Sequence, residues 1–113
     1  MNPKPRRGEI WLANTGGKRH AGVVISVNAR NERTESILFI PFGSLGREGP
    51  TVIQMEPGET GLGETSNLKA HFISVVQQKD LSERLPRVMS QRQMRELVHR
   101  VNCAIDPDAD ASL

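Results

Sequence analysis

The feature of this sequence that most restricts its fold is that helical periodicity occurs only once, near the C-terminus. Between Gln91 and Ile105, apolar side chains recur at steps of three or four residues, which places them on one face of a helix. Ser90 precedes this segment and Gln93 stands three positions later, which is the pattern of an N-terminal capping box. The sequence therefore predicts one amphipathic helix over residues 91–105, and the remaining chain must build its core from other elements.

The segments before this helix have the character of short strands separated by turns, because β-branched and apolar runs alternate with glycine-rich and polar clusters. Strands are expected over residues 9–13, 20–27, 35–42 and 51–55, and from 66 to 76 with a turn near 72–74. Polar turns or loops are expected over residues 14–18, 28–33, 43–49 and 56–65, and a shorter helical turn over 80–84. Pro41 lacks a backbone donor, so its strand is expected to end, bulge or lie at an edge there.

Several short strands followed by one helix predict an α+β fold, with a small antiparallel, partly closed β-barrel and the helix packed against it. The 113 residues are expected to form one domain over 1–113, with an ordered core at about 6–105 and an acidic tail at 106–113. Aromatic residues make up only 4% of the chain, so aliphatic side chains must form most of the core. Trp11, in the first strand, is expected to be buried there.

Charge and composition narrow the classes of function. The formal net charge of +2 is compatible with a local phosphate-binding face but not with a polybasic coat. The single cysteine excludes an internal disulfide, and the three scattered histidines show no metal-ligand spacing. No apolar run is long enough to span a bilayer, and the start lacks the apolar segment of a secretory signal. We therefore expect a cytoplasmic protein with no membrane partner.

Five short stretches give the chain a family resemblance. They are R-R-G-E-I-W-L at residues 6–12, G-G-K-R-H-A-G-V-V-I-S at 16–26, L-F-I-P-F-G-S at 38–44, G-L-G-E-T-S-N-L at 61–68 and V-M-S-Q-R-Q-M-R-E-L at 88–97. In this order and near this spacing, they resemble the MazF/PemK family of toxins from type II toxin–antitoxin systems. The resemblance covers roughly residues 6–105.

The resemblance implies a barrel related to SH3 domains and to the gyrase poison CcdB, assembled as a homodimer. It implies an endoribonuclease that cuts single-stranded RNA at short sequences without a metal or other cofactor. The expected products carry a 2′,3′-cyclic phosphate and a 5′-hydroxyl. The expected partners are the RNA substrate and a cognate antitoxin protein, which threads a disordered segment across the RNA site.

Metal-free RNA cleavage needs a base, an acid and a cation beside the phosphate. The resemblance assigns the cation to Arg19, whose guanidinium can hold two phosphate oxygens at once. A second alignment, counted back from V-V-I-S, places His20 in the arginine position, where an imidazole can act as base or acid. The competing interpretations are a solvated turn arginine and a strand-start histidine that faces solvent.

Two further positions depart from the family pattern. Gly43 falls on the first threonine of the family's pair and Ser44 on the second, so Ser44 is the candidate hydroxyl donor to the phosphate. If Gly43 takes the functional place instead, the hydroxyl is missing. The alternative role of Ser44 is a loop serine that bonds its own backbone.

The remaining candidates are expected to bind RNA rather than to react with it: Lys18, Gly43, Glu9, His71 and Ser74. His71 and Ser74 replace an acidic residue and an arginine of the family pattern, so the recognised RNA sequence should differ. Phe72 is expected to fill the core rather than to stack on a base. Glu9 is expected to order the first turn or the neighbouring arginines. The arginines around the helix are expected to form a solvated face: Arg84, Arg87, Arg92, Arg95 and Arg100.

Two alternatives to an active nuclease stay open. One is a CcdB-like inhibitor of DNA gyrase on the same fold, and the other is a degenerate toxin that only binds its antitoxin. The gyrase alternative is the less favoured, because Trp11 lies in the first strand and the tail after Ile105 is acidic. The degenerate toxin is suggested by three altered residues: Gly43, His71, and His20, which stands where the family usually has a proline.

Overall fold

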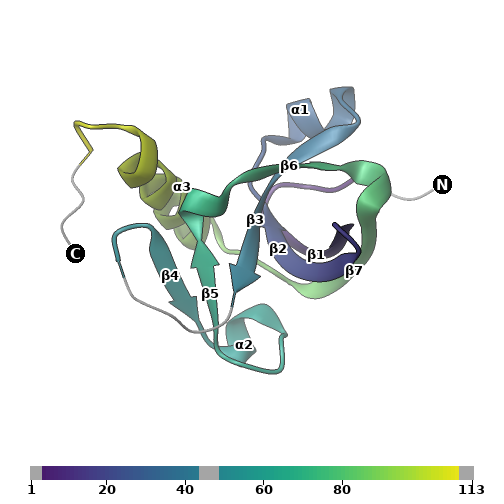
Figure 1. Ribbon diagram of the computed structural model, residues 1–113, viewed down its shortest axis with the longest axis horizontal. Helices are drawn as coiled ribbons and strands as arrows, with labels where there is room; N and C mark the ends of the chain where they lie inside the picture. Colours follow the sequence, from purple (N-terminus) through teal and green to yellow (C-terminus); the bar gives the residue numbers. More distant parts are fainter. Residues whose placement is uncertain (1–3, 44–48, 110–113) are drawn as a thin grey trace.

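The structure is a computed structural model that describes residues 4–43 and 49–109. It has the expected α+β architecture, an antiparallel sheet of seven strands with a C-terminal helix (Figure 1). The elements are β1 (Glu9–Thr15), β2 (Lys18–Val24), α1 (Asn28–Arg33), β3 (Ser36–Gly43), β4 (Val52–Met55), α2 (Pro57–Thr60), β5 (Ser66–Lys69), the 3₁₀ turn η1 (Ala70–Phe72), β6 (Ser74–Gln77), the 3₁₀ turn η2 (Gln78–Asp80), β7 (Leu81–Val88) and α3 (Gln91–Ile105).

The sheet is curved but open. Its order is β4-β5-β3-β2-β1-β7, and β6 pairs with the first half of β3. Every neighbouring pair is antiparallel. Figure 1 shows the β4–β5 hairpin and α3 toward one end of the molecule, with β1, β2 and β7 toward the other. Within the described residues, no strand pairing joins the two ends of the sheet, so the expected barrel is only partly closed.

Pro41 lies where β3 changes its partner. The residues from Ser36 to Phe39 pair with β6, whereas Phe42 and Gly43 pair with β5. Pro41 falls between these two pairings and has a partner residue only on the β2 side. The missing backbone donor is therefore tolerated, because one side of the strand has no ladder at this point. The strand does not end at Pro41 but continues to Gly43.

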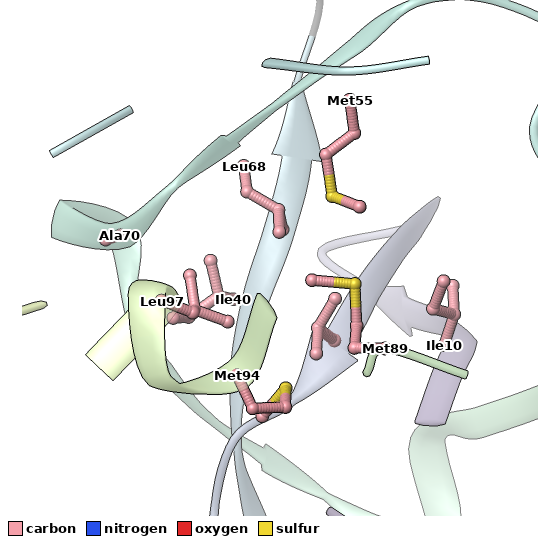
Figure 2. Close-up of a cluster of buried hydrophobic side chains, with 9 residues drawn as sticks. Ile10, Ile40, Met55, Leu68, Ala70, Met89, Met94 and Leu97 are labelled. Carbon is pink, nitrogen blue, oxygen red and sulfur yellow. The ribbon is translucent and has the colours of Figure 1, made fainter. Parts of the chain in front are cut away.

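Two cores lie on opposite faces of the sheet, and the strands in its centre contribute to both. Neighbouring residues on β1 show the alternation, because Ile10 belongs to one core and Trp11 to the other. Trp11 is buried, as expected. The first core lies under α3, where Figure 2 shows Met94 and Leu97 of the helix among side chains of the strands. The second core contains Trp11, Ala13, Val24, Ile37, Phe39 and Val76.

The predicted helix is confirmed over residues Gln91–Ile105, including its capping box. The Gln93 amide donates to the Ser90 hydroxyl at 3.1 Å, and the Ser90 amide donates to the Gln93 side chain at 2.8 Å. Burial of the apolar face declines along the helix, because Leu97 is fully buried whereas Ile105 is 71% exposed. Within the described residues, no helix is long and apolar enough to cross a membrane.

Three of the expected loops and turns are corrected. Residues 28–33 form α1 rather than a turn, because the buried Asn31 side chain donates to the carbonyl of Ser26 and fixes the helix against the sheet. The expected loop at 56–65 contains the short helix α2, whose capping box joins Glu56 and Glu59. The expected helical turn at 80–84 is wrong, because these residues are mostly part of β7, which pairs with β1.

Candidate functional site

A cavity of about 710 Å³ opens on the face of the sheet that carries the second core. Its lining comes from the β1–β2 hairpin, from β3 between Phe39 and Gly43, and from the continuous segment of β5, η1 and β6. The lining residues are Thr15, His20, Phe39, Pro41, Phe42, Gly43, Lys69, His71, Phe72, Ile73, Ser74, Val75 and Val76.

The β1–β2 hairpin determines which side chain of β2 reaches this cavity. Gly16 and Gly17 form its turn with φ of 58° and 77°, a left-handed conformation that favours glycine. His20 pairs with Ala13, which belongs to the second core, so the His20 side chain lies on that face and lines the cavity. Arg19 pairs with Asn14 and, by the alternation of a strand, points to the opposite face.

Gly22 allows the aromatic wall of the cavity to lie close to β2. A Cβ atom on Gly22 would come within 2.4 Å of the Phe39 ring and 2.6 Å of the Ile40 carbonyl oxygen. The absent side chain therefore leaves the space that the ring of Phe39 occupies. Phe39 is buried and takes part both in the second core and in the cavity lining.

The segment after β5 places polar and aromatic groups along another wall. His71 is oriented by a hydrogen bond of 2.8 Å between its Nδ1 atom and the Thr51 hydroxyl. The hydroxyl of Ser74 donates to the carbonyl of Phe72 at 2.8 Å, which shapes the turn into β6. The expectation that Phe72 fills the core is wrong, because its side chain is 52% exposed. It packs instead against the His71 ring, with 4.5 Å between the ring centroids.

Lys69 brings a cation to the point where β3 ends. A Cβ atom on Gly43 would lie 3.2 Å from Lys69 Cε and 3.3 Å from Lys69 Nζ. The same ammonium group lies 5.6 Å from the centroid of the Phe72 ring, a cation–π distance. The end of Lys69 therefore lies between the bare backbone of Gly43 and an exposed aromatic ring.

The structure brings four of the candidate residues together, since His20, Gly43, His71 and Ser74 all line the cavity. Lys18 shares its strand face with His20 but, like Arg19, is not among the lining residues. Ser44 lies outside the described residues.

Glu9 orders the first turn, as expected. Its carboxylate accepts from the Arg6 amide at 2.7 Å and from Trp11 Nε1 at 3.1 Å, and it lies 3.7 Å from the Arg84 guanidinium. The expectation that the arginines around the helix are solvated is confirmed for Arg84, whose side chain is half-exposed. It is wrong for Arg100, whose side chain is largely covered and donates to the carbonyl of Pro50 at 3.2 Å.

Lys69 is the residue that sequence reasoning missed. The sequence signal for Lys69 is its position two residues before His71, so that two polar side chains follow each other at the end of a strand. Only the folded structure places both side chains in the lining of the same cavity.

The titratable residues of the lining are His20, Lys69 and His71, and no carboxylate stands among the lining residues. This set favours an anionic ligand such as a phosphate. Within residues 4–43 and 49–109, no group of three or more His, Cys, Asp or Glu side chains is placed to hold a metal ion.

Solved structures with the same fold come from bacterial toxins. An endoribonuclease bound to its cognate antitoxin, from a mycobacterial species, matches with a TM-score of 0.77 and 24% identity, covering 88% of this chain and 93% of that chain. The Mycobacterium tuberculosis toxin MazF-mt6 matches with a TM-score of 0.78 and 16% identity, covering 88% and 98%. The MazE–MazF complex of Deinococcus radiodurans matches with a TM-score of 0.73 and 19% identity, covering 89% and 94%.

The sequence itself decides the family. No curated protein matches the chain significantly. The model of the PemK-like, MazF-like toxins of type II toxin–antitoxin systems matches residues 6–105, nearly the whole chain. All five ordered motifs lie within this range, so the expected resemblance is confirmed. The chain belongs to the PemK-like, MazF-like toxin family of type II toxin–antitoxin systems.

Proposed function

We propose that this protein is a single-domain toxin that cleaves single-stranded RNA in the cavity on the His20 face of the sheet. The cleavage needs no metal ion, recognises a short sequence, and leaves a 2′,3′-cyclic phosphate and a 5′-hydroxyl. The observation that carries the proposal is the lining of the cavity, whose titratable groups are two imidazoles and one ammonium. These are the groups that metal-free transfer of a phosphodiester requires, a proton acceptor, a proton donor and a cation.

The exposed aromatic wall supports a nucleic-acid ligand. Phe72 presents more than half of its side chain beside the cavity, and a base can stack on such a ring. A phosphate next to that base lies within reach of the ammonium of Lys69, because this ammonium already lies over the same ring. The requirement for an unstacked base makes single-stranded RNA the favoured substrate over a duplex.

We assign the general base to His20, because its side chain faces the cavity and an imidazole can accept the proton of a 2′-hydroxyl near neutral pH. Arg19 points to the other face of β2, so a contact between Arg19 and the RNA would lie outside this cavity. A catalytic role for Arg19 stays a prediction, as does one for Ser44. Lys18, exposed on the His20 face, is placed to contact phosphates that flank the cleaved bond.

The proposed partners of this protein are a cognate antitoxin and a second copy of the same chain. A cognate antitoxin covers the cavity and blocks access of RNA, as a toxin–antitoxin pair requires. Two of the solved relatives were determined as complexes of toxin with antitoxin. The free toxin is a homodimer, which light scattering of the purified protein can measure.

The test is cleavage of a long single-stranded RNA in the presence of EDTA, followed by mapping of the ends. We expect discrete cuts with 2′,3′-cyclic phosphate ends for the native protein, and a loss of cutting of roughly 100-fold or more in His20→Ala. RNA that stays intact with the native protein contradicts the proposal. If His20→Ala cuts RNA fully and Arg19→Ala loses the cutting activity, the active groups lie on the other face of β2.

The bare backbone at Gly43 favours one competing function, a degenerate toxin, since the residue that lines the cavity there has no hydroxyl. Such a toxin binds its antitoxin but leaves RNA intact, so the same experiment separates the two. Inhibition of supercoiling by purified gyrase, with intact RNA, would instead support the gyrase alternative.

A further inference from the structure

We propose that Lys69 and His71 are catalytic residues of this site, Lys69 as the cation that stabilises the transition state and His71 as the general acid. The inference rests on the proposed function, because it names further reacting groups for that same cleavage. It starts from the contact between Lys69 and Gly43. The position that the family resemblance gives to a threonine is occupied here by glycine, and a lysine from the neighbouring strand reaches into the space beside it.

Lys69 is positioned by the pairing of β3 with β5. Phe42 pairs with Leu68 and Gly43 with Asn67 in an antiparallel ladder, so Lys69, which follows Leu68, lies toward Pro41 and diagonally across from Gly43. The side chain of Lys69 then lies along Gly43, with Cε and Nζ 3.2 and 3.3 Å from the point where a Cβ would stand. A side chain at position 43 would require the flexible end of Lys69 to shift by a few tenths of an ångström. The ammonium therefore takes the place of the missing hydroxyl and adds a positive charge to the hydrogen-bond donors.

Thr51 holds the segment of His71 at two points. The backbone amide of Ala70 donates to the Thr51 carbonyl at 2.8 Å, and the Thr51 hydroxyl bonds His71 Nδ1, also at 2.8 Å. A hydroxyl both donates and accepts, so this bond is compatible with neutral and protonated imidazole. With Nδ1 engaged, Nε2 is the nitrogen left for a ligand. An imidazole fixed in this way presents one proton donor at a defined place, as a general acid requires.

His71 has neighbours on two sides. His20 and Lys69 share its cavity, and from the other side α3 packs against η1. One charged side chain of α3, Arg100, is hydrogen-bonded to this region, because it donates to the carbonyl of Pro50 at 3.2 Å and also to Glu96 at 2.9 Å. Arg100 therefore lies behind the segment of Thr51, and its charge is already paired with Glu96.

The reaction is an internal transfer of the phosphodiester. The 2′-hydroxyl oxygen forms a bond to phosphorus while the bond from phosphorus to the 5′-oxygen breaks. The 2′-hydroxyl proton passes to neutral His20, and protonated His71 gives its Nε2 proton to the departing 5′-oxygen. Lys69 keeps its charge throughout and binds the non-bridging oxygens, whose charge grows in the transition state. Proton exchange with water returns both imidazoles to their starting states.

For Lys69, the experiment compares Lys69→Gln and Lys69→Arg in the RNA cleavage assay. Lys79→Gln removes an exposed lysine of η2 outside the cavity and is the matched control. We expect Lys69→Gln to lower kcat by roughly 100-fold, Lys69→Arg to retain much of the activity, and Lys79→Gln to cleave like the native protein. Native-like kcat in Lys69→Gln, with active native protein, overturns the role of Lys69 and leaves the proposed function standing.

For His71, the experiment uses an RNA in which sulfur replaces the bridging 5′-oxygen at a mapped cleavage site. A thiolate leaves without protonation, so the general acid becomes dispensable. We expect His71→Gln to lose cleavage of ordinary RNA, to recover near-native rates on the sulfur substrate, and to lose the alkaline fall of the pH–rate profile. His99→Gln, an exposed histidine of α3, is the control. Equal loss on both substrates, with an unchanged pH profile, shows a structural role and overturns the assignment.

Discussion

At the scale of single residues, the site depends on which face of a strand each side chain occupies. His20 and Arg19 are neighbours in the sequence, yet β2 directs them to opposite faces of the sheet. Both were candidates from the motif alone. Alternation along a strand places them on opposite faces, but only the pairing of β2 with β1 shows which face meets the cavity. The pairing of His20 with Ala13 places His20, but not Arg19, at the cavity.

The contact between Gly43 and Lys69 gives a prediction about activity. The substitution Gly43→Ala places a methyl group 3.2–3.3 Å from the end of Lys69, so this flexible side chain must shift. We expect RNA cleavage to fall several-fold, while the midpoint of thermal unfolding stays nearly unchanged. Cleavage rates and calorimetry on the same preparation check this, and unaltered cleavage would show that the position of Lys69 is unimportant.

Gly22 gives a prediction about stability. The substitution Gly22→Ala drives a methyl group into the Phe39 ring and the Ile40 carbonyl, both parts of the packed sheet. We expect the free energy of unfolding to fall by about 1–3 kcal/mol, the usual cost of overpacking. Urea denaturation measures it. Gly63→Ala is the matched control, because a Cβ there meets nothing within 4 Å, and an equal loss in both variants would contradict the packing argument.

At the scale of elements, prediction succeeded where the signal is local. The helix α3 begins and ends at the predicted residues, because its capping box and apolar spacing are written within the helix itself. The helix α1 was taken for a turn, because the contact that holds it joins the polar side chain of Asn31 to Ser26 in the neighbouring segment. Strand β7 was missed for a similar reason. Its residues are mostly exposed and show no apolar alternation, so pairing with β1 defines it.

The cap of α3 can be tested directly. Ser90→Ala removes the acceptor of the Gln93 amide, and we expect the free energy of unfolding to fall by about 1 kcal/mol. Ser90→Asp keeps an acceptor at the same place and is expected to stay close to the native value. Denaturant titrations of the two variants measure this free energy. An equal loss of stability in both variants would mean that the Ser90 hydroxyl does not act as a cap.

At the scale of the whole molecule, the cavity is assembled from segments far apart in the chain. The hairpin supplies His20, β3 supplies Gly43, and the stretch around η1 supplies Lys69 and His71. The sequence alone named three of these four residues as candidates, because each departs from the family pattern. It did not name Lys69, since the pairing of β3 with β5 that brings it to Gly43 is a long-range feature. It also misjudged Phe72, because an isolated phenylalanine is more often buried than exposed.

The central claim is that RNA binds on the His20 face, and chemical-shift mapping tests it most directly. The ligand is a single-stranded RNA that covers a mapped cleavage site, with 2′-O-methyl groups in place of the 2′-hydroxyls to prevent cleavage. Titrated into ¹⁵N-labelled protein, it is predicted to shift the amide signals of His20, Lys69 and Phe72. On the Arg19 face of β2, a second hollow is lined by Ala21, Leu62 and Ser66. Shifts confined to Arg19 and this hollow would contradict the account.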